Sequence, residues 1–241
     1  MNLKLKASLK DCVFCVNIAF LLNLPFRRSL PLKFDFQLPV SVLVLMICCL
    51  LFPVLQSISF PLFDGMTVTA VESIQALLLL FFAIFTFFYI RPLEIQDGKK
   101  QFWLWAVAWW LLLFGRSISW GRDYFPDVPK PYFRLISVFM IAPVVFMLFS
   151  PYLRQEIVHK LKTLALPIWP FGLVILGLFI SDAVEHSRSL SFLFLYDLAY
   201  KDFIEEVYEF PLIFGLFLTA YPWLQHDHVP QELEVMQYHK E

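Results

Sequence analysis

Six long apolar runs account for most of the chain, and polar or proline-rich connectors separate them. An α-helix needs about 20 apolar residues to cross the hydrocarbon core of a bilayer, and these runs have about that length. The pattern therefore predicts an all-α membrane protein built as a bundle of about six transmembrane helices. The predicted spans are residues 38–57, 67–90, 102–121, 133–150, 164–186 and 202–223.

The two ends of the chain differ from this pattern. Residues 1–35 form a basic segment whose apolar run, 13–24, is shorter than a typical span and has basic residues on both sides. A signal peptide is the rival interpretation, but Pro25-Phe26-Arg27-Arg28 does not resemble a small-residue cleavage site. We expect a helix that lies at the membrane interface or dips partly into it. Residues 36–223 are then the transmembrane domain, and 224–241 a soluble C-terminal tail.

Composition supports a membrane location. Apolar residues make up 59% of the chain and its mean hydropathy is +0.68, whereas soluble domains are typically about 45–50% apolar. The sequence has no glycine-rich phosphate loop and no nucleic-acid-binding motif. We expect membrane lipids as partners, leave open a cytoplasmic protein partner and a homo-oligomer, and expect no nucleic acid.

The distribution of basic residues predicts the orientation. Basic residues concentrate in the N-terminal segment and in the 91–101 and 151–163 connectors, which places these regions and both termini in the cytoplasm. The 122–134 connector holds Arg122, Lys130 and Arg134 and counts against this scheme, although Asp123 and Asp127 lie among them.

Ionisable and polar residues gather near those ends of four predicted spans that this topology places in the outer half of the membrane. The candidate ligand-binding residues are Glu72 in the second span; Arg116, Ser119 and Arg122 at the end of the third; Asp182, Glu185 and His186 at the end of the fifth; and Glu205, Glu206 and Glu209 at the start of the sixth.

The positions of these residues on their helices, and the free-energy cost of exposing a charge to lipid, both favour bringing them together. Residues three or four apart share a helical face, as Asp182, Glu185 and His186 do. A charge facing lipid costs about 2.5–3.5 kcal/mol or more at the centre of a span. We therefore expect the polar faces to point at one another and to form a pocket opening towards the periplasm.

Several functions fit such a pocket. The leading hypothesis is a binding or sensing protein that recognises a cation, a proton or a lipid headgroup and signals to a cytoplasmic partner. A less favoured version of this hypothesis is that Glu205, Glu206, Glu209 and His186 bind a divalent cation. The alternatives are a membrane hydrolase or transferase acting on a lipid-linked substrate, and an ion-coupled transporter. A purely structural network of arginines and carboxylates also remains open.

Two resemblances concern the same regions. Glu205-Glu206 resembles the paired glutamates of intramembrane glutamic proteases of the CAAX-processing type, but Phe210 stands where that family has arginine, so we reject the assignment. The segment Ser117-Ile-Ser-Trp-Gly-Arg-Asp-Tyr-Phe125 resembles the Glu-Ile-Ser-Trp-Gly-Gln-Arg-x-Phe segment of uncharacterised bacterial polytopic proteins, and departs from it at Ser117. This resemblance implies a multi-pass protein of the bacterial inner membrane and names no reaction.

Overall fold

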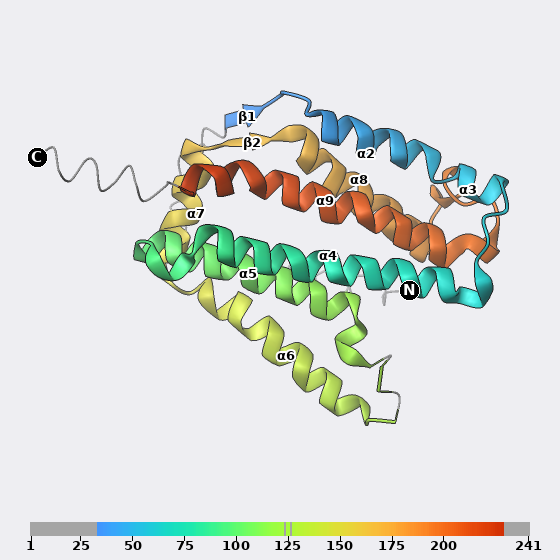
Figure 1. Cartoon of the computed structure of the whole chain (residues 1–241), viewed down its shortest axis with the longest axis horizontal. Coiled ribbons are helices and arrows are strands. Elements are labelled where there is room, and N and C mark those ends of the chain that lie inside the picture. The colour runs from blue at the N-terminus through green and yellow to red at the C-terminus, as the bar shows by residue number, and fades with distance from the viewer. Residues whose placement is uncertain (1–32, 123, 126, 229–241) are drawn as a thin grey trace, which may run out of the picture.

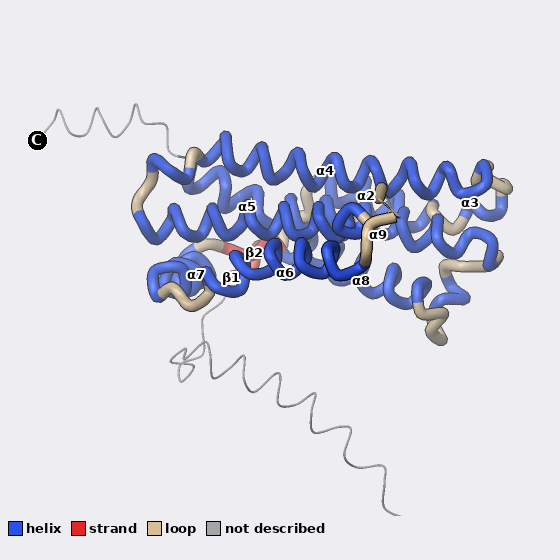
Figure 2. Tube along the Cα trace, turned by 90° about the horizontal axis from the view of Figure 1, so that it is seen from below, coloured by secondary structure: helices blue, strands red, loops and turns tan. Residues whose placement is uncertain are grey.

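The computed structural model describes residues 33–122, 124–125 and 127–228, which are mostly helical (Figures 1 and 2). In chain order the elements are β1 (Lys33–Asp35), α2 (Val40–Leu51), α3 (Val54–Ser57), η1 (Phe63–Gly65), α4 (Met66–Ile90), η2 (Pro92–Glu94), α5 (Asp97–Ser117), η3 (Ser119–Gly121), α6 (Lys130–Met147), α7 (Pro151–Thr163), β2 (Ala165–Pro167), α8 (Ile168–Glu185), η4 (Ser191–Leu193), η5 (Leu198–Tyr200) and α9 (Lys201–Asp227).

The predicted all-α class is confirmed, and the number of spans is confirmed only in part. Four helical segments of the described chain are long and apolar enough to cross a membrane: Val40–Ser57, Phe63–Glu94, Lys130–Met147 and Ile168–Glu185. Helices α5 and α9 correspond to the other two predicted spans and contain 21 and 27 residues. They are not among the four segments that are long and apolar enough, so length and composition do not establish six spans.

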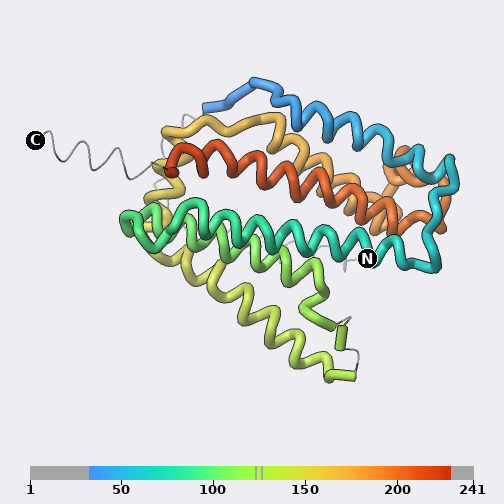
Figure 3. The backbone as a smooth tube through the Cα atoms, in the orientation of Figure 1, coloured from blue at the N-terminus to red at the C-terminus, as the bar shows by residue number. Residues whose placement is uncertain are grey.

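The long helices α2, α4, α5, α8 and α9 lie side by side, and α6 diverges from α5 towards its own N-terminal end (Figures 1 and 3). Helix α9 packs against α8 and α4, and α5 packs against α4. The closest packing is between α8 and α9, where Gly177 faces the backbone of α9 and Gly215 faces the backbone of α8. Small residues at such positions let two helices approach closely.

Large apolar side chains cover much of the outer surface. Leu50 on α2, Phe88 on α4 and Phe139 on α6 each have at least 70% of their surface exposed. Exposed apolar patches of this extent are unusual on a soluble monomer but are expected where lipid forms the surroundings. The surface therefore fits a membrane-embedded protein.

Several proline residues lie within or between the helices. Pro53 separates α2 from α3. Pro143 lies inside α6, and Pro211 and Pro222 lie inside α9. Each proline lacks the backbone N–H that an α-helix needs at that position, so each weakens the local hydrogen-bond pattern.

One predicted connector is a helix. Residues 151–163, which we expected to be a basic loop, form α7 at the end of the bundle where α4 ends and α5 begins (Figure 1). Leu153 and Ile157, four residues apart, pack into the apolar cluster around Trp103. The short strand β2 follows α7 and pairs in parallel with β1, an arrangement that the apolar pattern did not indicate.

A buried ion pair ties α7 to the end of α9. The ammonium of Lys160 contacts the carboxylate of Asp227, and their side chains are 2% and 1% exposed. The indole Nε1 of Trp103 also donates to Asp227, at 2.8 Å. Helix α9 therefore continues to Asp227, beyond the predicted end of the sixth span at residue 223, and Leu224 is buried.

The remaining terminal predictions lie outside the described residues. These are the interfacial helix expected at 13–24 and the part of the tail beyond residue 228. The segment 187–200 between α8 and α9 contains only the short turns η4 and η5. Gln56 of α3 anchors this segment, because its amide donates to Phe194 and accepts from the backbone of Tyr196 and Asp197.

Candidate functional site

A polar cavity of about 180 Å³ lies between α4, α5 and α9, where α5 ends and α9 begins. We call it the acidic cavity. Its apolar lining includes Leu79, Leu113, Leu212 and Ile213. Its polar lining residues are Glu72, Gln75, Arg116, Ser117, Ser119, Glu205, Glu206 and Glu209. Four carboxyl groups and one guanidinium thus line a single space.

Helix α9 supplies three of these carboxyl groups from its first turns. Glu205, Glu206 and Glu209 lie on the side of α9 that faces α4 and α5, while Ile204, Val207 and Tyr208 are buried in the apolar core on its other side. The hydroxyl of Tyr208 donates to the carbonyl of Cys49 at 2.8 Å, which fixes the rotation of α9 against α2. The rotation of this helix therefore determines which acids face the cavity.

Gln75 joins α4 to α9 beside the acids. Its side chain is 1% exposed, and its Nε2 donates to the backbone carbonyl of Glu206 at 2.6 Å. Glu72 lies one turn earlier on α4 and lines the same cavity. A buried amide must satisfy its hydrogen bonds, so this contact sets the depth of α4 relative to α9.

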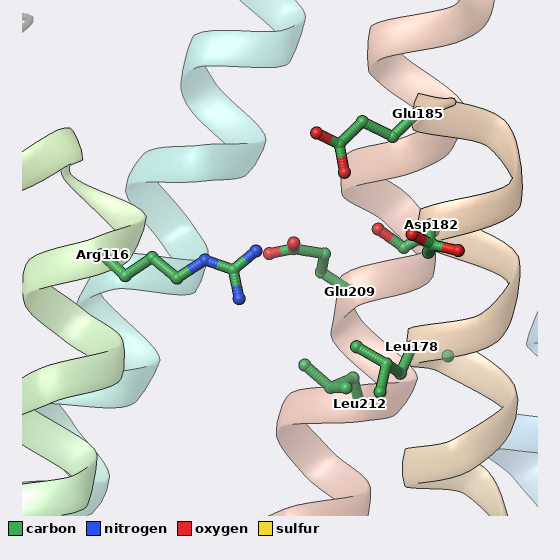
Figure 4. A pocket seen from close by; sticks show the side chains of 8 residues that line it. Arg116, Leu178, Asp182, Glu185, Glu209 and Leu212 are labelled. Atoms are coloured by element: carbon green, nitrogen blue, oxygen red, sulfur yellow. The ribbon is translucent and has the colours of Figure 1, made fainter. Parts of the chain in front are cut away.

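The end of α5 supplies the positive charge. Arg116 occupies the last turn of α5, and its guanidinium points towards the carboxylate of Glu209 (Figure 4). The chain then reverses through η3, where Ser119 and Trp120 have φ angles of 47° and 58°. The ring of Trp120 packs so closely on Gly115 that an added Cβ there would lie 2.7 Å from a ring carbon. The turn places Ser117 and Ser119 at the cavity wall.

A second, smaller cavity of about 100 Å³ adjoins the same arginine. Arg116 and Glu209 line it from α5 and α9, and Ser181, Asp182 and Glu185 line it from α8 (Figure 4). The Arg116 and Glu209 side chains therefore line both cavities. Together the two cavities bring side chains of all four predicted polar faces to one end of the bundle.

Some predicted site residues lie apart from this arrangement. His186 lines neither cavity, and its Nδ1 lies 3.4 Å and 3.6 Å from carboxylate oxygens of Asp182 and Glu185. Arg188 pairs with Asp182 at 3.0 Å, a contact that we did not predict. Arg122 lines a separate basic pocket, to which Ser119 also contributes.

The arrangement does not resemble a metal site. Within the described residues, no three His, Cys, Asp or Glu side chains come close enough together to hold a metal ion. The side chains expected to hold a divalent cation, Glu205, Glu206, Glu209 and His186, form no such group. The imidazole of His186 instead lies beside the carboxylates of Asp182 and Glu185.

Sequence reasoning omitted two polar residues from the candidate site. Gln75 and Ser117 both line the acidic cavity, and the Ser117 Oγ is buried with no hydrogen-bond partner. Their positions carried a signal, because Gln75 follows Glu72 by three residues and Ser117 adjoins Arg116. Uncharged side chains near predicted charges are easily attributed to general helix packing.

Comparison with known proteins identifies no relative: no family model, no curated protein and no solved structure matches the chain. The function must therefore be inferred from the cavity itself.

Proposed function

We propose that this protein is a six-span protein of the bacterial inner membrane that binds a ligand carrying a positively charged amine in the acidic cavity. The observation that carries the proposal is the composition of the cavity wall, on which Glu72, Glu205, Glu206 and Glu209 outnumber the single cation Arg116. Carboxylates in a low-dielectric setting favour a bound cation, and a separate anionic group of the ligand would lie against Arg116.

The size of the cavity narrows the ligand class. Sites for drug-sized ligands are typically about 300–1,000 Å³, and the acidic cavity has about 180 Å³. It would hold a small headgroup rather than a whole lipid. A zwitterionic headgroup with a primary ammonium and a phosphate, as in phosphatidylethanolamine, matches both the excess of carboxylates and the single arginine.

Purified full-length protein would test this by native mass spectrometry in nanodiscs with phosphatidylethanolamine or phosphatidylglycerol. We expect preferential retention of phosphatidylethanolamine, and about tenfold weaker retention by Glu205→Gln and Glu206→Gln. Asp202→Asn is the matched control, since Asp202 lies on the same helix but outside the cavity wall. Equal retention by the wild type and both glutamine variants would sink the proposal.

The orientation is part of the proposal. Alkaline phosphatase fusions after the 58–66 and 187–200 segments would be active if these face the periplasm, and fusions after the 91–101 connector would be inactive. The opposite pattern would place the acidic cavity on the cytoplasmic side. The positively charged 91–101 and 151–163 regions support the orientation that we propose.

Helix α9 provides a path for signalling. Its first turns line the acidic cavity, and its last turn is fixed to α7 through the contact between Lys160 and Asp227. Pro211 and Pro222 lie between these points and weaken the helix at two positions. A ligand that displaces the start of α9 would alter its end, where the proposed cytoplasmic partner would bind.

One observation favours a membrane enzyme as the second candidate. The unpartnered hydroxyl of Ser117 lines the acidic cavity with the three glutamates of α9, which could act as general bases on a lipid-linked substrate. Ser117→Ala separates the two functions. An enzyme would lose turnover of the headgroup with this variant, whereas the binding protein that we favour would retain phosphatidylethanolamine as the wild type does.

A further inference from the structure

A separate polar pocket, of about 340 Å³, lies between η3 and the first turns of α6. We call it the basic pocket. Its charged lining residues are Arg122, Lys130 and Arg134, and the hydroxyl residues Ser119 and Ser137 also line it. None of its described lining residues is an acid; the nearby acid Asp127 is exposed and is not part of the wall. The pocket thus carries the opposite charge to the acidic cavity.

The start of α6 explains how these cations come together. Lys130, Arg134 and Ser137 are spaced by four and three residues and therefore share one face of the helix. Phe133, which is only 7% exposed, packs beneath them and holds this face towards η3. Helix α6 packs against η3, and Arg122, which directly follows the left-handed turn of η3, lines the same pocket.

Three cations and the Ser119 hydroxyl are complementary to a phosphate group. Guanidinium and ammonium groups form charge-assisted hydrogen bonds with phosphate oxygens, and the Ser119 hydroxyl can supply a further donor. The Ser137 hydroxyl instead donates to the backbone carbonyl of Arg134 at 2.8 Å. The basic pocket also includes the N-terminal residue of α6, an 18-residue helix whose dipole favours negative charge at this end.

The surroundings indicate that the phosphate belongs to a lipid. Val138 on α6 adjoins Ser137 of the pocket and is 61% exposed. Leu135 and Phe139, on the other side of this helix, are 67% and 77% exposed. Helix α6 diverges from α5 here, as the yellow-green tube in Figure 3 shows. An acyl chain could lie along Val138 while the headgroup phosphate enters the pocket. Free phosphate would gain nothing from this apolar surface.

We infer that the basic pocket binds the phosphate group of an anionic phospholipid, with the acyl chains along α6. The simpler alternative is that Lys130 and Arg134 only extend towards headgroup water, as basic residues at membrane interfaces often do. Such extension alone would not bring Arg122, which follows η3, into one pocket with the two cations of α6. The site is separate from the acidic cavity and does not depend on its proposed ligand.

The test uses full-length protein in phosphatidylcholine nanodiscs that contain a small fraction of phosphatidylglycerol. Native mass spectrometry of the released complexes should show that wild-type protein retains phosphatidylglycerol. We expect Lys130→Gln and Arg134→Gln each to weaken this retention by about tenfold. Ser137→Asp, which places a carboxylate in the pocket, should have at least the same effect.

Lys201→Gln is the matched control, because it removes one positive charge at the same end of the bundle but outside the pocket. Retention unchanged by the pocket variants, or reduced equally by Lys201→Gln, would show general surface attraction and overturn the inference. Displacement of the lipid by inorganic phosphate at equal concentration would overturn its assignment to a lipid. Thermal unfolding midpoints equal to the wild type would show that the exposed Lys130 and Arg134 sites tolerate substitution.

Discussion

Lys160 and Asp227 form a buried ion pair between α7 and the last turn of α9, although 67 residues separate them in the chain. Glu156 and Lys99 approach the same pair, with Oε1 of Glu156 3.4 Å from Lys160 and Nζ of Lys99 3.5 Å from Asp227. The Lys160 ammonium also lies 4.9 Å from the ring centre of Phe102. This network closes the end of the bundle opposite the two cavities.

Removing either member of the pair should destabilise the protein strongly. Asp227→Asn or Lys160→Met leaves one buried charge without its main partner, and such losses typically cost about 3–5 kcal/mol. The thermal unfolding midpoint in detergent measures the effect. The double variant Lys160→Met/Asp227→Asn buries neither charge and should be more stable than at least one single variant. A double variant with additive losses would show that the two residues are not coupled.

The same pair predicts sensitivity to acid. Asp227 lies beyond the proposed span 202–223; burial acts to raise its pKa, but the hydrogen bond and charge of Lys160 outweigh burial and hold the pKa below its ordinary value. A lowered folded-state pKa stabilises the protein above the unfolded pKa of about 3.9, and this stabilisation is lost as the pH falls through the folded-state value. Wild-type unfolding midpoints should therefore fall below about pH 4. The part of this decline due to Asp227 should be absent in Asp227→Asn, and identical pH profiles would contradict the prediction.

The sequence indicated the long helices well because each depends on a local apolar run. It did not indicate α7, since Arg154, Lys160 and Lys162 made this segment resemble a basic loop. The burial of Lys160 depends on Asp227, which no local pattern relates to it. Amphipathic spacing of Leu153 and Ile157 was the signal that could have revealed the helix.

In the candidate site, too, the sequence indicated local features but not contacts between distant segments. Helical phase indicated which residues share a face of each helix, and the structure places Glu72, Arg116 and Glu209 around one cavity. Phase could not indicate which helices are neighbours, because that depends on contacts such as Gln75 with the backbone of Glu206. His186 was expected at the site, but the carboxylates of its own helix lie closer to it.

Arg116 and Glu209 should be energetically coupled. Arg116→Ala removes the one cation of the acidic cavity and leaves its four carboxyl groups to repel one another, so the unfolding midpoint should fall. Glu209→Gln should partly restore the midpoint in the Arg116→Ala background, with a coupling energy of about 1 kcal/mol, reduced by the exposure of Arg116. A coupling energy of zero would show that Figure 4 depicts proximity without an interaction.

The glycines between α8 and α9 should tolerate no side chain. A Cβ on Gly177 would lie 2.8 Å from the backbone nitrogen of Leu212, and one on Gly215 would lie 2.9 Å from the carbonyl oxygen of Pro170. Backbone atoms cannot move aside without separating the helices, so Gly177→Ala and Gly215→Ala should each destabilise the protein by about 1–3 kcal/mol. Separation of the helices at Gly177 would also change the shape of the smaller cavity, of about 100 Å³, which Gly177 lines together with Arg116 and Glu209.

Gly172→Ala is the matched control on the same helix as Gly177, because an added Cβ there would meet no atom within 4 Å. Alanine has the higher helix propensity, so this variant should be neutral or more stable by up to about 1 kcal/mol. The comparison uses unfolding midpoints of the three alanine variants in one detergent. If Gly177→Ala matched Gly172→Ala, the close contact of α8 with α9 would not be a source of stability.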